Sequence, residues 1–302
     1  MIEQTSPDSR VVDVAVRVLE SRLRAVVHAL PPAARHADDD VEHVHDLRVV
    51  SRRALSALHV FADLVPKRRG RWLIRALERI RKAAGTARDT DVLLTRWRLD
   101  ERVPHSVLRD IERRRRRVQK PLIEIDQRYV KSGRLARRIG KLVAKVAARG
   151  RKASARQAPR FGAWADGVLA TRVEALFAAS RESSTSPAAL HHFRIAGKEL
   201  RYSIEVLAGA FPGELARDIY PVIEELQGKT GKITDQAIAC ARLRKRLDRP
   251  GSRHAAVKVA RLLRAQEARR DEATRAFYAW WTPERSAELH DHFLKLRPCS
   301  SA

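Results

Sequence analysis

The chain has little of what several protein classes depend on. Of its 302 residues only two, Cys240 and Cys299, are cysteines, too few for a disulfide framework or a zinc cluster and compatible with a reducing compartment. Aromatic residues make up 5% of the chain, which argues against a protein that stacks nucleic-acid bases. No run of 18 or more apolar residues occurs, so we expect no membrane span.

The N-terminal residues also lack a targeting signal. Residues 1–10 are largely polar, and no apolar segment of signal-peptide type follows them. We therefore expect a cytoplasmic protein. The length allows one large domain or two modest ones, with enough material for a hydrophobic core.

Acidic residues are in the minority. The chain has 62 Lys and Arg against 36 Asp and Glu, a formal net charge of +26. Such an excess says nothing about the fold, but its self-repulsion favours a polyanionic partner that neutralises it. Nucleic acid, inorganic polyphosphate and an anionic membrane surface are the three candidates.

One amphipathic stretch, residues 44–61, stands out. On a helix at about 100° per residue, His45, Arg48 and Arg52 fall within about 60° of one another. The apolar residues gather on the other side: Leu47, Val50, Ala54, Leu58 and Phe61. Core packing explains the apolar side but not a face that carries a histidine and then cations at +3 and +7.

The same pattern returns 146 positions later (191 minus 45). The second stripe consists of His191, Arg194, Lys198 and Arg201. Three further landmarks keep the offset, namely the pairs Gly85 and Gly231, Asp89 and Asp235, and Pro104 and Pro250. This agreement indicates a tandem internal repeat. We place the first repeat at 1–150, the second at 151–282 and a C-terminal tail at 283–302.

The rest of the chain is predicted to be helical, because no long segment alternates apolar and polar residues with a period of two. The fold class is therefore all-α. Proline and glycine predict the helix ends: Pro31-Pro32 after a helix over 10–30, Pro66 after 44–65, and a left-handed turn at Gly85 after 69–84. Asp89 would then begin a new helix. The other expected helices are 105–130, 160–181, 189–210, 214–230 and 253–281.

The two His-x-x-Arg helices, the first followed by Gly85 to Val92 and the second by Gly231 to Asp235, resemble the CHAD family, the conserved-histidine α-helical domain. The resemblance covers about residues 8–281. It implies two tandem four-helix bundles related by pseudo-two-fold symmetry around a basic central groove or cavity. It also implies binding of inorganic polyphosphate and a place on polyphosphate granules. Its anion-binding residues would be His45, Arg48, Arg52 and Arg53 in the first repeat and His191, Arg194, Lys198 and Arg201 in the second.

Further cations extend the predicted site. A second stripe on the third helix comprises Arg71, Arg75, Arg79 and Lys82. The second repeat lacks this stripe, and we expect Lys229 and Lys232 to replace it in part, so the first repeat should contribute more charge. Arg88, beside Asp89, completes the polyphosphate-binding set. We expect Asp89 and Asp235 to cap helices or to orient arginines.

Cations at i, i+3, i+7 and i+10 advance about 4.5 to 6 Å per step along a helix. Such rows suit a flexible linear polyanion, and the guanidinium fork suits phosphate oxygens. For His45 and His191, ligand contact and a structural role remain open alternatives. We expect binding without turnover, and no cofactor or metal.

Two other functions compete with polyphosphate binding. Non-specific nucleic-acid binding fits the charge but not the low aromatic content. A metal-dependent phosphohydrolase would use His-Asp pairs such as His45-Asp46 and His290-Asp291. However, the repeat mate of Asp46 is His192, and His290 lies outside the repeat. The sequence leaves the oligomeric state open.

Overall fold

A computed structural model describes residues 5–37, 39–152, 159–184, 186–248 and 253–298. Within these ranges every element longer than an isolated bridge is a helix, which confirms the all-α prediction. One β-bridge pairs Arg10 with Arg160, so the starts of the two repeats lie side by side. None of the described helices is long and apolar enough to cross a membrane.

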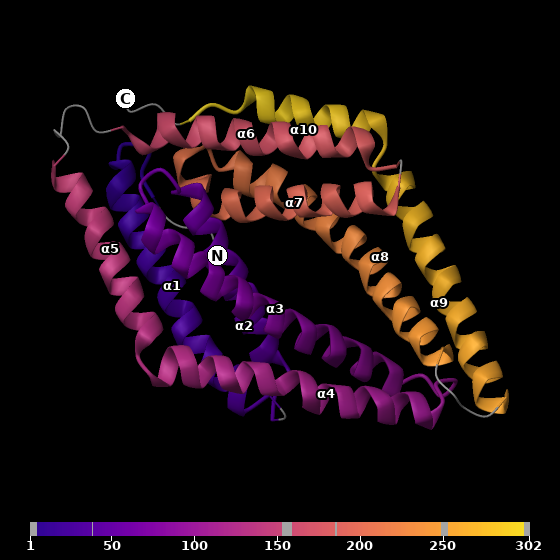
Figure 1. Cartoon of the computed structure of the whole chain (residues 1–302). Helices are drawn as coiled ribbons and strands as arrows, with labels where there is room; N and C mark the ends of the chain where they lie inside the picture. The colour runs from indigo at the N-terminus through magenta and orange to yellow at the C-terminus, as the bar shows by residue number, and fades with distance from the viewer. Residues whose placement is uncertain (1–4, 38, 153–158, 185, 249–252, 299–302) are drawn as a thin grey trace.

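The first repeat forms five α-helices joined by short connections (Figure 1). They are α1 (Val11–Arg35), α2 (Glu42–Val60), α3 (Lys67–Arg98), α4 (His105–Asp126) and α5 (Arg134–Lys152), with a π-helical segment, Gln127–Lys131, between the last two. The second repeat forms α6 (Phe161–Glu182), α7 (Pro187–Leu207), α8 (Tyr220–Leu247) and α9 (Arg253–Trp280). A short 3-10 helix and a π-helical turn, Ala208–Ala210 and Leu215–Ile219, precede α8.

Several predicted helix ends are wrong, among them the end of the helix predicted over 44–65, which stops at Val60. The first helix continues through Pro31 and Pro32 to Arg35 because Ala33 and Ala34 are buried in the core, which holds the last turn in place. Gly85 lies inside α3 rather than in a left-handed turn. Its neighbours Ala84 and Ala87 are both buried, so packing holds the helix straight across the glycine.

Gly231 behaves in the same way. It lies inside α8 between the buried residues Thr230 and Ile233. Consequently Asp89 and Asp235 stand in the middle of long helices, and the prediction that they cap helix starts is wrong. Tertiary packing outweighs the cost of about 1 kcal/mol for a glycine in a helix interior.

The buried apolar residues do not divide into one core per repeat. The larger core contains Val14 and Leu58 of the first repeat together with Phe193 and Leu207 of the second. A smaller core lies at the far end, where α3 and α4 meet α8 and α9 (Figure 1). Trp97 and Leu243 belong to it. The two repeats are therefore joined at both ends of α3.

The segment predicted as a tail contains a further helix, α10 (Pro283–Lys295). It lies along α6 (Figure 1). Leu289, Phe293 and Leu296 are buried, and the Phe293 ring meets Phe177 of α6 at a centroid distance of 6.5 Å. The sequence places these apolar residues at i, i+4 and i+7, which is a helical spacing.

Candidate functional site

The two His-x-x-Arg helices, α2 and α7, contact each other, and α3 and α8 flank them. Each helix buries its apolar side, including Leu47 and Leu58 of α2 and Phe193 and Leu200 of α7. Their cationic sides are thereby turned toward the space between the repeats. Two cavities lie there.

The first, which we call the His45 cavity, has a volume of about 260 Å³. Helices α2, α3, α7 and α8 all contribute to it. Its polar lining consists of His45, Arg48, Arg52, Arg88, Asp89, Arg96, Arg194 and Asp235. Residues from both repeats, far apart in sequence, thus share one cavity.

The second, which we call the Lys198 cavity, has a volume of about 420 Å³. Its charged and imidazole lining consists of Arg52, His59, Glu78, Arg81, Arg172, His191, Lys198 and Glu199. Arg52 lines both cavities, so they adjoin. We refer to the two together as the basic groove.

Three cations at the junction of the cavities crowd one another. Burial and then Arg48 lower the pKa of Arg52, and burial and then Arg52 lower that of Arg194. The pKa of Lys198 falls to about 6, mainly through burial and secondly through Arg194 and Arg52. In the described part of the chain, no ion pair joins any of the three to a carboxylate. An anion at this point would relieve the repulsion.

Carboxylates neutralise other cations of the groove. Arg48 donates to Asp89 at 2.6 Å, and Arg88 donates to Glu42 at 3.0 Å. The predicted role of Asp89 in orienting an arginine agrees with the first of these contacts. Asp235 lines the His45 cavity as well. That cavity therefore carries mixed charge, and Asp235 and Asp89 offset part of the effect of burial and of the neighbouring arginines on the pKa of Arg194.

The two histidines of the repeated pattern, His45 and His191, do not share a cavity. His45 lines the first cavity and His191 the second. Partial burial, followed by Arg194 and Lys198, lowers the pKa of His191 and so favours its neutral ring. Among the hydrogen bonds of the described residues, none involves either ring.

Arg53 and Arg201, which the resemblance assigns to the anion, are both in contact with a buried carboxylate. Both contact the carboxylate of Glu205, which is fully buried: Arg53 at 2.7 Å and Arg201 at 3.4 Å. The Tyr220 hydroxyl also donates to it, at 3.1 Å. This network fastens α2 to α7 and α8, and neither arginine lines a cavity of the groove.

The third-helix stripe does not reach the groove either. Arg71, Arg75, Arg79 and Lys82 line neither cavity. Arg79 instead donates to the Tyr129 hydroxyl at 3.3 Å, on the side of α3 that faces the π-helical segment. Because α3 is unbroken, the direction of each side chain is fixed by its position along one continuous helix.

The predicted replacements in the second repeat lie outside the groove too. Lys229 pairs with Glu225 at 3.4 Å, and its amine lies 5.2 Å from the centre of the Trp280 ring. Lys232 is exposed and lines neither cavity. The first repeat supplies more of the Arg and Lys residues that line the two cavities than the second, but not through the stripe on which that expectation rested.

Sequence reasoning missed three arginines of the groove, Arg81, Arg96 and Arg172. The first two have a signal in the sequence. On an unbroken helix, Arg81, Arg88 and Arg96 are spaced by seven and eight residues and share one side. The predicted helix end at Gly85 separates Arg81 from Arg88 and Arg96, so the row is not recognised from the sequence.

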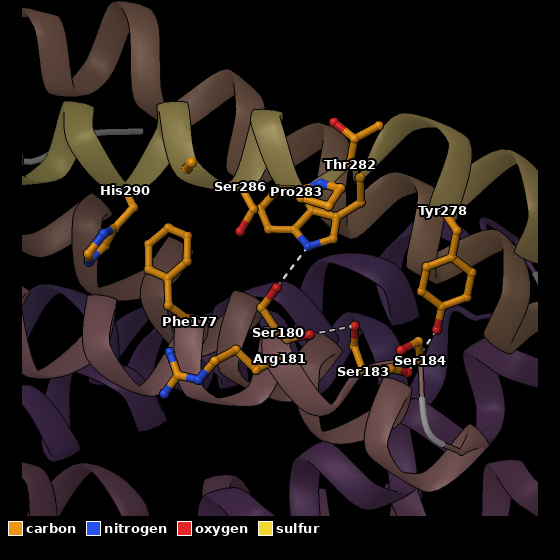
Figure 2. A pocket seen from close by; sticks show the side chains of 12 residues that line it. Phe177, Ser180, Arg181, Ser183, Ser184, Tyr278, Thr282, Pro283, Ser286 and His290 are labelled. Carbon is orange, nitrogen blue, oxygen red and sulfur yellow. Dashed lines mark hydrogen bonds between the residues drawn. The ribbon is translucent and has the colours of Figure 1, made fainter.

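A separate cavity of about 500 Å³ lies between α6, α9 and α10 (Figure 2). Its polar groups are engaged with one another: Trp281 donates to the Ser180 hydroxyl at 2.8 Å and Tyr278 to the Ser183 carbonyl at 2.7 Å. His290 lines this cavity and packs against Phe177, apart from His45. In the described ranges no group of three or more His, Cys, Asp or Glu side chains is placed to hold a metal ion.

Fold and site together define an all-helical protein with a basic groove between two sequence repeats. The family model of the CHAD domain matches residues 17–244. The chain therefore belongs to the CHAD family, which confirms the resemblance. None of the curated proteins matches it.

Two solved structures share the fold. The crystal structure of the CHAD domain from the plant Ricinus communis is 20% identical with a TM-score of 0.66, and the match covers 99% of this chain and 96% of that one. PptA from Streptomyces chartreusis is 16% identical with a TM-score of 0.65, and the match covers 93% and 100%. At this level of identity the likeness shows the fold alone.

Proposed function

We propose that this protein binds inorganic polyphosphate in the basic groove and does not hydrolyse it. The observation that carries the proposal is the junction of the two cavities, where Arg52, Arg194 and Lys198 lie together without a carboxylate partner among the described residues. Partly buried guanidiniums that crowd one another are costly unless an anion accompanies them. The same burial and crowding leave the amine of Lys198 neutral above about pH 6 until an anion restores its charge.

The form of the groove favours a linear phosphate polymer. The cations follow one another through two adjoining cavities rather than closing around a single anion. Tyr202 is the one Phe, Tyr or Trp among the lining residues, and Arg201 already covers its ring at 4.5 Å. A ligand with bases would therefore gain little by stacking, whereas phosphate oxygens suit the guanidinium forks.

We infer that the repeats are related by an approximate two-fold axis near the contact between α2 and α7. The equivalent positions Arg48 and Arg194 line one cavity, which supports this arrangement. Polyphosphate binding would also bring the protein to polyphosphate granules.

Equilibrium binding of polyphosphate to an Arg52→Gln/Arg194→Gln variant tests the proposal. We expect an affinity loss of at least about tenfold. The log–log salt slope should be shallower by about 1.4 to 1.8, because two counterion-displacing contacts are lost. An Arg24→Gln/Arg217→Gln variant removes the same charge from two exposed arginines outside the groove.

Equal affinities for the groove variant and this control would overturn the proposal.

Competition with duplex DNA at matched charge tests the nucleic-acid alternative. We expect polyphosphate to displace DNA, and displacement in the opposite direction would favour a nucleic-acid-binding protein.

A further inference from the structure

Helix α5 carries charge of one sign only. Between Asp126 and Asp166 the sequence contains no acidic residue. Within α5 itself the cations recur on the outward side, including Lys141 and Lys145 at a spacing of four residues, or about 6 Å along the helix. An ordinary solvated face carries charges of both signs.

Packing fixes the orientation of this helix. Leu135, Ile139, Leu142 and Val146 are all buried against the core. At Gly150 the backbone of α5 lies so close to α1 that an added Cβ would fall 2.6 Å from Val12. The helix therefore cannot rotate to hide its cations, and α5 forms an outer edge of the molecule (Figure 1).

The cationic stripe of α3 joins the same surface. The guanidiniums of Arg134 and Arg138 lie 5.4 and 4.9 Å from the centre of the Trp72 ring of α3. Arg79 donates to Tyr129, whose ring meets Trp72 edge-on. We define the outer basic face by six residues of the two helices: Arg75, Arg79, Arg134, Arg138, Lys141 and Lys145.

Carboxylates pair with several cations elsewhere on the surface. Arg24, Arg98 and Arg217, for example, each form an ion pair with a nearby carboxylate, at 2.8 to 3.0 Å. None of the six has an ion pair within 4.0 Å among the residues described. Their charges are therefore not neutralised by a carboxylate contact, and a row of such cations attracts an external polyanion.

The chemistry of the face narrows the choice of polyanion. No large apolar side chain of α5 is exposed, so the face offers nothing to insert into a bilayer. The Trp72 ring is covered by two guanidiniums and Tyr129 is buried, so bases find no free ring. The phosphates of a rigid duplex would also curve away from a straight row of cations. A flexible phosphate chain without bases can follow the row.

We propose that the outer basic face is a second polyphosphate-binding surface, so that one molecule bridges two polyphosphate segments. This proposal rests on the function proposed for the groove. The two sites are separate, because none of the six residues lines a groove cavity. On α3, the neighbouring residue Glu78 lines the Lys198 cavity. The side chain of Arg79 points about 100° away from that of Glu78, and so away from the cavity.

The test compares four proteins: wild type, the groove variant Arg52→Gln/Arg194→Gln, an outer-face variant Arg75→Gln/Lys141→Gln/Lys145→Gln, and both sets combined. The outer-face set avoids the arginines that pack on Trp72 and Tyr129, so that the fold is kept. An Arg24→Gln/Arg98→Gln/Arg217→Gln variant is the matched control for charge.

Titration with a short polyphosphate gives the stoichiometry, and light scattering with a long polyphosphate reports cross-linking. We expect two short chains per wild-type molecule, one for each single-site variant and none for the combination. Cross-linked assemblies should form with wild type and the control only. An outer-face variant that matches the control in both measurements would overturn the proposal.

Failure of the groove proposal gives a different result. In that case the groove variant would behave as wild type, while the outer-face variant would still lose a bound chain.

Duplex DNA and vesicles of anionic lipid serve as further probes. Loss of DNA or vesicle binding in the outer-face variant, with polyphosphate stoichiometry unchanged, would assign the face to that other partner and refute our proposal.

Discussion

Arg53 of α2 and Glu205 of α7, 152 positions apart, form an ion pair at 2.7 Å in which the carboxylate is fully buried. Arg201 and Tyr220 complete the environment of that carboxylate. The contact fastens together the two helices whose cations line the groove. Two of the eight residues that the resemblance assigns to the anion thus hold the site in shape.

Replacing Arg53 with Met should lower the free energy of unfolding by about 1.5 to 3 kcal/mol, because the buried carboxylate keeps only part of its partners. Urea unfolding followed by circular dichroism measures the change. Adding Glu205→Gln to the same chain should restore part of the loss. An Arg53→Met protein as stable as wild type would refute this role.

Polyphosphate affinity should fall as the pH rises above about 6. The pKa of Lys198 is about 6 in the free protein, and a bound anion raises it, so binding takes up a proton above that pH. Calorimetry in buffers of different ionisation enthalpy measures the uptake. Lys198→Met should remove most of the uptake and leave only the share of His191, whose pKa is also lowered, and an unchanged pH profile in that variant would contradict the assignment.

The same pKa shift has a consequence for stability. In the unfolded chain Lys198 stays protonated up to its ordinary pKa of 10.5, whereas in the folded protein it is neutral above about 6. The unfolded state binds more protons between these values, so Lys198 makes the free protein more stable as the pH rises through this window. Thermal unfolding of wild type and Lys198→Met across that range tests the sign.

Gly85→Ala should stabilise the protein by about 0.5 to 1 kcal/mol, since Gly85 lies in a helix interior with no atom within 4 Å of an added Cβ. A glycine in a left-handed turn would give the opposite result. Gly133 has a φ of 63°, so Gly133→Ala is the matched control and should destabilise. Chemical denaturation distinguishes the two cases.

Leu243→Ala should cost about 2 to 5 kcal/mol, because it opens a cavity in the small core that joins α3 and α4 to α8 and α9. Leu99→Ala is the control, since Leu99 is 83% exposed. Denaturant midpoints give the comparison. Equal midpoints for both variants would mean that the second core does not hold the repeats together.

Purified protein should release no orthophosphate from polyphosphate, with or without added divalent cation. A colorimetric phosphate assay over a long incubation checks this expectation. Steady release that disappears in a His45→Ala variant would instead assign an enzymatic activity to the groove.

Much of the site could be predicted from local patterns. The period of the apolar residues places His45, Arg48 and Arg52 on the polar side of one helix, and the repeat does the same for His191, Arg194 and Lys198. The directions of the third-helix cations could not be predicted in this way. They depend on whether α3 continues through Gly85, and burial of Ala84 and Ala87 decides that.

The sequence by itself determined the helical class, the repeat, the family and the excess of positive charge, because periodicity, motif spacing and composition are properties of neighbours along the chain. The tertiary structure alone decided which cations are paired. Arg53 meets a buried carboxylate, whereas Arg52, one residue away, meets other cations. The reason is that the state of a charge depends on the groups within a few ångströms of it, and packing brings these together from other helices: Glu205 of the second repeat beside Arg53, and Arg81 of α3 near Arg52.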